Sequence, residues 1–382
     1  SFLCYNDISA MSRLHRSASS RMSRSAISIQ SGGGWTFGSP SVLMMFYRAP
    51  GELESELAEM DECMPHYYRV TNRHGQGAET IMRAEALFYQ GHVTDAHIEL
   101  ERAYAQVGGN GQINMALCCD FLSWRLSLHT DVERRYTFSE RYAALLRYHD
   151  ASWINIWSAT SAYYHALRGE TDKIPEIFSQ HRLSDIHLLA PGKPMMEMIE
   201  NQVYLAQGAY AKVVGRSAEL LAACEAMHYA LVALHIRIQT AAAYARLGKP
   251  ETAHAWLQKA LSDAGPDGLV MPFAENYSLL KPLLARETRS AFAARITALG
   301  EAAQARGAER LRPAAFRALT AREFEIVELM VQRLSNREIA QKCYLSEGSV
   351  KQYVNQIYSK LHIEGDTRTK RAQLVALLHE KT

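Results

Sequence analysis

The sequence lacks the apolar segments of membrane and secreted proteins. No apolar run among its 382 residues approaches the length of about eighteen that a membrane-spanning helix needs. Residues 1–30 are basic and rich in serine, without the continuous apolar stretch of a secretory signal. The sequence therefore predicts a cytoplasmic protein that does not bind membranes.

The cysteines show no pairing pattern. The chain has six of them, and no two have C-x-x-C spacing, which argues against a disulfide framework. Cys63 and His66 lie three residues apart and could form half of a metal site. Structural zinc needs four ligands, and no second pair is present, so we expect reduced thiols and no metal.

Motifs for nucleotide binding and catalysis are also missing. Three glycines stand at 32–34, but neither a Gly-Lys-Ser/Thr sequence nor G-x-G-x-x-G spacing accompanies them. The histidines His66, His74 and His92 have no recognisable catalytic neighbours, and we expect them at the surface. We therefore predict that the protein is not an enzyme and binds no cofactor.

Charge is spread unevenly along the chain. The net charge is +2, but residues 311–382 carry +4, residues 1–50 carry +4, and residues 51–310 carry −6. A basic C-terminal segment that follows an acidic central region suits a nucleic-acid-binding domain joined to a regulatory region.

The stretch from Leu319 to Leu361 has three helix start signals. Thr320 with Glu323, and Ser335 with Glu338, have the S/T-x-x-E spacing of capping boxes. Ser346 is a third N-cap candidate, and residues 343–345 form a tight turn before it. Two short helices joined by such a turn predict a helix-turn-helix.

The third of these helices has one apolar and one polar face. Its apolar stripe, which must face a core, consists of Val350, Val354, Ile357 and Leu361. Lys351, Gln352 and Asn355 then point outward near the helix start, where they could read bases in a DNA major groove. Ser349 and the free N–H groups of that helix end could hold a phosphate. The alternative is a solvated polar face on a small bundle.

This stretch resembles the LuxR-type helix-turn-helix. The residues that carry the resemblance are Leu319, Thr320, Arg322, Glu323, Glu325, Ser335, Asn336, Glu338, Ile339, Ala340, Leu345, Ser346, Val350, Lys351, Tyr353, Ile357, Tyr358, Lys360 and Leu361. Four positions depart from the pattern: Arg333 replaces a glycine, Cys343 a leucine, Ser349 a threonine and Gln356 an asparagine. We expect these departures to alter DNA preference rather than to abolish binding.

The resemblance implies a bacterial transcription regulator that binds double-stranded DNA as a homodimer, with RNA polymerase as a candidate partner. The expected DNA-binding residues are Lys351, Gln352, Asn355, Ser349, Tyr353, Lys342, Lys360, Ser335 and Asn336. A fourth helix, from Thr367 to His379, would support dimerisation and be capped by Asp366 or Thr367. We expect its apolar positions to be Ala372, Val375, Ala376 and Leu378.

Helical patterns with a glycine turn repeat between Glu52 and Leu261. The turn glycines are Gly91, Gly169, Gly208 and Gly248, with spacings of 78, 39 and 40 residues. Halving the first spacing predicts a degenerate unit with its turn at Thr130. Five units of this kind predict an all-α fold, a helical-hairpin solenoid followed by the small helix-turn-helix domain.

The repeats resemble tetratricopeptide repeats, and the chain around them resembles MalT-like regulators. Gly91 with Ala96 and Ala103 keeps the Gly-to-Ala offsets of the tetratricopeptide family. The sequence after Ala260 and the segment 35–48 are similar to parts of the MalT-like helical sensor region. MalT-like regulators carry an ATPase module before this region, so we expect either a C-terminal portion of such a protein or a member without the ATPase.

We predict three segments: a connector or remnant at 1–50, a helical repeat sensor or interaction domain at 51–312, and the DNA-binding domain at 313–382. A helix at 286–312 and a hinge at Pro313 would separate the last two. The concave face of the repeats would bind an unidentified effector or partner. Seven aromatic residues could line that face, though we expect most in the core: Trp124, Trp153, Trp157, Tyr163, Tyr164, Tyr204 and Tyr210. The alternative function is a protein-interaction scaffold whose weak DNA affinity would depend little on salt.

Overall fold

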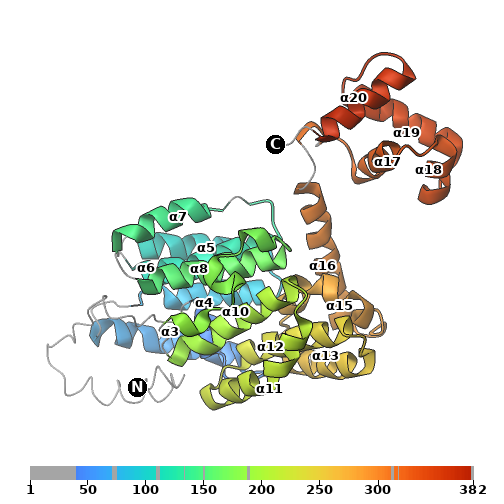
Figure 1. The fold of residues 1–382 in the computed structure, drawn as a ribbon. Helices are drawn as coiled ribbons and strands as arrows, with labels where there is room; N and C mark the ends of the chain where they lie inside the picture. The colour runs from blue at the N-terminus through green and yellow to red at the C-terminus, as the bar shows by residue number, and fades with distance from the viewer. Residues whose placement is uncertain are drawn as a thin grey trace. The chain divides into compact units, whose positions relative to one another are not determined.

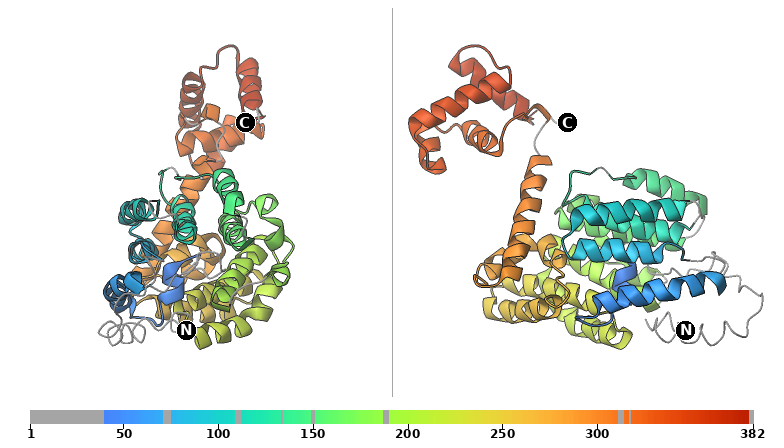
Figure 2. Two further views of the ribbon diagram at one scale, coloured as in Figure 1. Left: turned by 90° about the vertical axis from the view of Figure 1, so that its left-hand side faces the viewer. Right: turned by 180° about the vertical axis from the view of Figure 1, so that it is seen from behind.

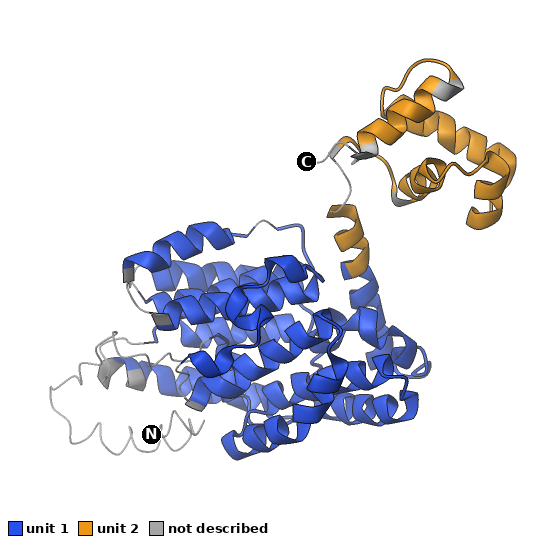
Figure 3. Ribbon diagram, in the orientation of Figure 1, with its two compact units in different colours: residues 1–303 blue, residues 304–382 orange. Residues whose placement is uncertain are grey.

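The computed structural model describes residues 40–70, 75–108, 112–132, 134–148, 151–186, 190–310, 314–316 and 318–379 (Figure 1). Within these ranges the chain is helical and has no strand, as predicted. Most of the expected connector at 1–50, the hinge at Pro313, and His74 lie outside the described residues. The chain forms two compact units, residues 1–303 and 304–382 (Figure 3).

The first unit consists of α-helices with short 3-10 turns between some of them. The α-helices are α2 (Val42–Phe46), α3 (Leu53–Val70), α4 (Ala78–Tyr89), α5 (Val93–Gly108), α6 (Ile113–Leu126), α7 (Phe138–Leu145), α8 (Ala151–Leu167), α9 (Glu176–Ser179), α10 (Lys193–Ala206), α11 (Tyr210–Met227), α12 (Ala230–Arg246), α13 (Pro250–Ala264), α14 (Met271–Glu275), α15 (Tyr277–Leu284) and α16 (Ala291–Arg310), whose residues from 304 onward belong to the second unit. The 3-10 turns are η2 (Leu146–Tyr148), η3 (Thr171–Lys173), η4 (Leu183–Asp185) and η5 (Ala190–Gly192).

Each predicted turn glycine lies between two helices and has a positive φ. The φ values are +81° at Gly91, +69° at Gly169, +76° at Gly208 and +71° at Gly248. This backbone region is open to glycine without steric cost, which explains why the repeated turns use it. The degenerate unit turns after α6, where Thr130 donates a hydrogen bond to the carbonyl of Leu126.

The helices of the first unit pack in sequence order, and the last ones return to the first. Helices α4, α6, α8, α10 and α12 each contact the next in that series, while α5, α11 and α13 pack beside them (Figure 2). Helix α14 then contacts α4, and α2 contacts both α4 and α12. The main-chain N–H of Ala230 donates to the carbonyl of Tyr47 across 3.1 Å, joining the start of α12 to the end of α2. The series therefore closes on itself.

Helix α2 is buried on every side. Every residue from Ser41 to Tyr47 is at most 2% exposed. Its free N-terminal N–H groups are satisfied locally, because Ser41 Oγ accepts from Met44 and the carboxylate of Glu85 accepts from the N–H of Leu43 at 2.7 Å. Burial raises the pKa of Glu85 to about 7. A short apolar helix of this kind is stable only when neighbours cover it completely.

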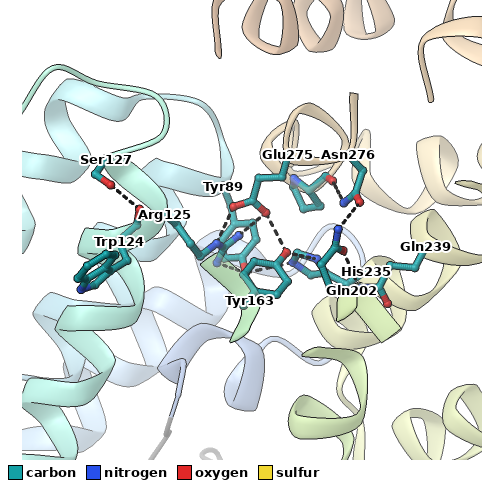
Figure 4. A network of polar contacts seen from close by, with 11 residues as sticks. Tyr89, Trp124, Arg125, Ser127, Tyr163, Gln202, His235, Gln239, Glu275 and Asn276 are labelled. Carbon is teal, nitrogen blue, oxygen red and sulfur yellow. Dashed lines mark hydrogen bonds and ion pairs between the residues drawn. The ribbon is translucent and has the colours of Figure 1, made fainter. Parts of the chain in front are cut away.

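A buried polar network joins five helices, α4, α6, α8, α12 and α14 (Figure 4). Arg125 of α6 donates to both carboxylate oxygens of Glu275 at 2.7 and 2.9 Å, and to the hydroxyl of Tyr89 at 2.8 Å. The hydroxyl of Tyr163 donates to Glu275 at 3.1 Å, and Tyr89 contacts His235 at 3.2 Å. The predicted inner binding face is therefore occupied here by the protein's own side chains.

A second group of amides continues this network. Gln239 donates to Gln202 at 3.0 Å, and Gln202 donates to Asn276 at 3.0 Å (Figure 4). Asn276 in turn donates to the carbonyl of Pro272. Buried amides normally need such partners. The hydrogen bonds between these three amides hold α10, α12 and the segment around α14 against one another.

The helix predicted at 286–312 begins later than expected. Residues 286–290 form turns, and α16 starts at Ala291 because the hydroxyl of Ser290 caps it by accepting from the N–H of Ala293. In α16, Gly300 packs directly on the ring of Tyr277, and a Cβ added there would lie 2.3 Å from a ring carbon. Glycine at this position allows α15 and α16 to approach closely.

The remaining predictions for this unit concern cysteines, histidines and aromatic rings. Among the described residues, the free cysteines are Cys63, Cys118, Cys119 and Cys224 in the first unit and Cys343 in the second, all buried. No three His, Cys, Asp or Glu side chains in the described part could hold a metal. His92 is exposed as expected, and the side chain of His66 is outside the described set.

The prediction that most of the seven aromatic residues are core residues is confirmed, because only Trp157, Tyr204 and Tyr210 are half-exposed.

None of the helices in the described part of the chain combines the length and apolarity required to cross a bilayer.

The second unit contains η6 (Ala314–Phe316), α17 (Ala321–Val331), α18 (Asn336–Cys343), α19 (Glu347–Lys360) and α20 (Thr367–His379). All five elements contribute to its core, which includes Phe316, Ile326, Ile339, Ile357 and Leu374.

Candidate nucleic-acid interface

Both predicted capping boxes are confirmed. Thr320 accepts from the N–H of Glu323, whose carboxylate accepts from the N–H of Thr320 at 2.7 Å. Ser335 and Glu338 repeat this exchange at the start of α18. These reciprocal bonds satisfy N–H groups that a helix start leaves free, so each cap fixes where its helix begins.

The turn between α18 and α19 is also where the sequence places it. Helix α18 ends at Cys343, and Tyr344 adopts the left-handed conformation with φ of +54°. The Tyr344 side chain is 96% exposed, which makes it the most prominent apolar group of the turn. Ser346 then caps α19 by accepting from the N–H of Ser349 at 3.0 Å.

Helix α19 has the orientation that the apolar stripe predicts. Val350 and Ile357 are fully buried, while Val354 and Leu361 are partly buried against the same core. The polar candidates Lys351, Gln352 and Asn355 are exposed, and Tyr353 is half-buried beside them. The exposed groups are a cation and two amides on the second and third turns of one helix.

Two of the predicted phosphate contacts already have partners within the domain. The N–H of Ser349 is bonded to Ser346, whose hydroxyl also lies 2.8 Å from the hydroxyl of Ser349. The ammonium of Lys360 donates to the carboxylate of Glu323 at 2.7 Å. A phosphate at either position would have to compete with these bonds.

Helix α18 holds the other three candidates. Lys342 is exposed near its C-terminal end, and Asn336 is half-buried at its first position. The hydroxyl of Ser335 is engaged in the capping box, where it also donates to Glu338 at 2.7 Å. Of the three, Lys342 is the most accessible to a ligand.

The residue that departs most from the resembled pattern occupies a glycine-like conformation. Arg333 follows α17 with φ of +64°, a region that side chains other than glycine disfavour. The carbonyls around it are held by Arg371 of α20, which donates to Met330 at 2.7 Å and to Leu334 at 2.6 Å. Arg371 therefore braces a turn whose own backbone is unfavourable.

Two arginines with structural roles were missed by the sequence analysis. Arg371 has no local signal, since its partners Met330 and Leu334 lie 41 and 37 residues earlier in the sequence. Arg322 donates to the carbonyl of Cys343 and pairs with Glu325. Arg322 is among the residues that carry the LuxR-type resemblance, but only the fold shows that it ties α17 to the end of α18.

The fourth helix has the predicted bounds and one of the predicted caps. Asp366 accepts from the N–H of Thr369 at 2.7 Å. The expected apolar face was partly wrong, because Leu374 is the fully buried residue, with Leu377 partly buried, while Ala372 and Ala376 are exposed. Leu374 and Leu377 therefore lie on the side of α20 that packs against the core, whereas Ala372 and Ala376 lie on the solvent side. The side chain of Leu378 is outside the described set.

Comparison with known proteins bears on this unit. Residues 317–372 match the family described as "Bacterial regulatory proteins, luxR family". The chain is similar to the transcriptional regulatory protein LnrK of Bacillus subtilis (strain 168), with 44% identity over 50 residues. This match covers 13% of the chain and 23% of LnrK, and no solved structure matches the chain. The C-terminal unit therefore contains a LuxR-type helix-turn-helix domain.

Proposed function

We propose that the protein is a transcription regulator that binds DNA sequence-specifically through α19, and that its helical first unit controls this binding. One observation carries the proposal. Helix α19 buries Val350 and Ile357 in the core of a LuxR-type domain while leaving Lys351, Gln352 and Asn355 exposed. An amide pairs with adenine and a lysine with guanine in the major groove, so this set suits base recognition.

The nearby residues supply the contacts that position such a helix. Lys342 at the end of α18 offers an exposed cation for the DNA backbone, and Tyr353 lies among the exposed residues of α19. Asn336 and Ser335 stand at the start of α18, where Ser335 is the N-cap and Asn336 the first helical residue. Backbone contacts of this kind fix the register of a protein on DNA without reading sequence.

The regulatory part of the proposal concerns the first unit. We propose that residues 51–312 act as a tetratricopeptide-like and MalT-like sensor for an effector or partner, and residues 313–382 as the DNA-binding domain. Homodimer formation on DNA would use α20, and RNA polymerase would be a further partner. Support comes from the hairpin series with its repeated glycine turns, which precedes the DNA-binding unit.

A selection from a random DNA library tests the proposal on the full chain. We expect a consensus sequence with two related halves, and affinity that falls steeply as salt rises. Replacing both Lys351 and Asn355 by alanine should remove the discrimination between consensus and random DNA, because those side chains read the bases. The helical circular dichroism signal should not change, since both residues are exposed.

Lys173→Ala is the matched control, because it removes an exposed lysine from the first unit. This variant should keep the consensus and the salt dependence. If the double variant keeps full discrimination, α19 is not the reading helix. If the intact protein enriches no sequence and binds DNA with little salt dependence, the protein is a scaffold instead.

A further inference from the structure

The turn between α18 and α19 presents a side chain that the packing of its own domain does not use. Tyr344 is 96% exposed, and its hydroxyl has no hydrogen-bond partner within the described part of the chain. Its backbone has φ of +54°, which a bulky side chain disfavours. The four turn glycines of the first unit adopt positive φ without this cost. Stability alone would therefore favour glycine or asparagine at this position.

The backbone of the turn is held in place without help from the tyrosine side chain. The N–H of Leu345 donates to the carbonyl of Ala340 at 2.9 Å. Arg322 donates to the carbonyl of Cys343, and Ser346 caps the helix that follows. The exposed ring is therefore attached to a fixed main chain, so a contact made by it requires little ordering of the protein.

The docking of a helix-turn-helix brings this turn to the DNA backbone. The first helix of such a motif crosses the sugar–phosphate backbone, and the second enters the major groove with its N-terminal part at the base edges. Here these helices are α18 and α19, and Lys351 and Asn355 lie on the part of α19 that would enter the groove. Tyr344 lies between the end of α18 and the N-cap of α19. The turn therefore passes the edge of the groove, where the phosphates are.

The charges around the turn are balanced. The nearest charged side chains in the sequence are Lys342, at the end of α18, and Glu347, the first residue of α19, and both are exposed. Arg322 is already paired with Glu325, and Glu338 is engaged in its capping box. The turn is therefore not a cationic patch. A neutral donor suits this place, and tyrosine is among the residues whose side chains donate to phosphate oxygens.

We propose that Tyr344 is a contact to the DNA backbone, with its hydroxyl donating a hydrogen bond to a phosphate oxygen at the edge of the groove that α19 reads. This inference rests on the proposed function and adds to it a residue that positions α19 without reading a base. The contact offsets the unfavourable backbone conformation only when DNA is bound. Tyr344 should therefore strengthen binding to any duplex by the same factor.

The test compares variants of the full chain on the selected consensus duplex and on a random duplex. Tyr344→Phe removes only the hydroxyl and should weaken binding to both duplexes by about tenfold, as for a lost hydrogen bond to a charged group. The slope of affinity against salt should not change, because a neutral donor releases no counterion. Lys342→Gln should instead lower that slope by about one, because it removes a cation from the backbone.

A second variant separates the contact from an effect on folding. Asparagine tolerates the left-handed conformation, so Tyr344→Asn should raise the unfolding temperature of the second unit while weakening DNA binding at least as much as Tyr344→Phe. The matched control is His228→Asn, which makes a similar change in the first unit, where His228 is exposed with φ of +56°. This control should leave DNA binding unchanged.

The phosphate itself can be located with consensus duplexes that each carry one methylphosphonate of defined configuration, in which a methyl group replaces one phosphate oxygen. At the contacted oxygen, the wild-type and Tyr344→Phe proteins should bind equally. If Tyr344→Phe binds both unmodified duplexes as tightly as the wild type, the proposal is overturned and the exposed ring is left to a protein partner. A loss confined to the consensus duplex would also overturn it, by marking a base contact. A wild-type protein that binds no duplex would instead reject the proposed function, and this inference with it.

Discussion

Lys360, the last residue of α19, donates a hydrogen bond to the same carboxylate oxygen of Glu323 that accepts the N–H of Thr320. One oxygen atom thus caps the first helix of the DNA-binding unit and fastens the end of the helix proposed to read DNA. Glu323 is only 3% exposed, so its carboxylate is shielded from water, while the Lys360 side chain is 40% exposed. The start of α17 and the end of α19 are therefore coupled.

Replacing Glu323 by glutamine should lower the free energy of unfolding of the second unit by about 1–3 kcal/mol, since a buried bond network loses its charge. The matched control is Glu338→Gln, which alters the second capping box, where Glu338 is exposed and bonds only within its own cap. Chemical denaturation followed by circular dichroism measures both. An effect of Glu338→Gln equal to that of Glu323→Gln would contradict the coupling.

Stability of this unit should also depend on acid. Burial raises the pKa of Glu323, but hydrogen bonds from Lys360 and Thr320 outweigh it and hold the pKa below its ordinary value. The contribution of a carboxylate with a lowered pKa is complete above the unfolded value of about 4.3 and disappears as the pH falls below it. Unfolding curves between neutral pH and pH of about 3 should converge for the wild-type and Glu323→Gln proteins. A difference in unfolding free energy between the two proteins that does not change with pH would show that ionised Glu323 does not stabilise the unit.

Arg333→Gly should stabilise the second unit by about 0.5–1 kcal/mol, because φ of +64° is unfavourable for arginine and open to glycine. Gln332→Gly, one residue earlier with φ of −68°, should destabilise it instead. Thermal unfolding of the two variants measures the contrast. Stabilisation by both or by neither would show that the conformation of Arg333 is not strained.

Two glycines of α16 should respond oppositely to alanine. Gly300→Ala would place a Cβ 2.3 Å from the Tyr277 ring and should destabilise the first unit, by about 1–3 kcal/mol for an overpacked contact. Gly307→Ala meets no atom within 4 Å and should stabilise the helix by up to about 1 kcal/mol. Urea unfolding checks both, and equal effects would mean that α16 shifts to accommodate the methyl group.

Arg125→Met should be strongly destabilising, by about 3–5 kcal/mol, because Glu275 would be left buried with an unbalanced charge. Replacing Glu275 by leucine in the same chain should restore much of that loss. Denaturant titrations of the wild-type, single and double variants give the coupling energy. Strictly additive single effects would show that the two side chains are not energetically linked.

The sequence was most informative where structure is decided locally. The two capping boxes, the turn at Tyr344 and the apolar stripe of α19 all depend on residues within one or two helical turns of each other. The bounds of α20 followed from the same kind of signal, although its buried face did not, because only the fold decides whether Leu374 or Ala376 meets the core.

Features that depend on distant residues could not be predicted. Arg125 and Glu275 are 150 positions apart, and nothing near either one marks it as buried. The same holds for Arg371, which reaches the carbonyls of Met330 and Leu334 only after the domain folds. The sequence predicted a concave face open to a ligand, because an array of hairpins that does not close leaves its inner face exposed. The contacts that close the array join residues far apart in the sequence.

The contacts of α14 with α4, and of α2 with α4 and α12, limit how many helical hairpins the first unit can contain. An open array can gain or lose a terminal hairpin, because each unit contacts only its neighbours. Here the first hairpin is held by the residues that follow the last one, so an inserted or deleted hairpin would move both ends out of reach of each other. We therefore expect this unit to tolerate changed side chains better than a changed number of hairpins.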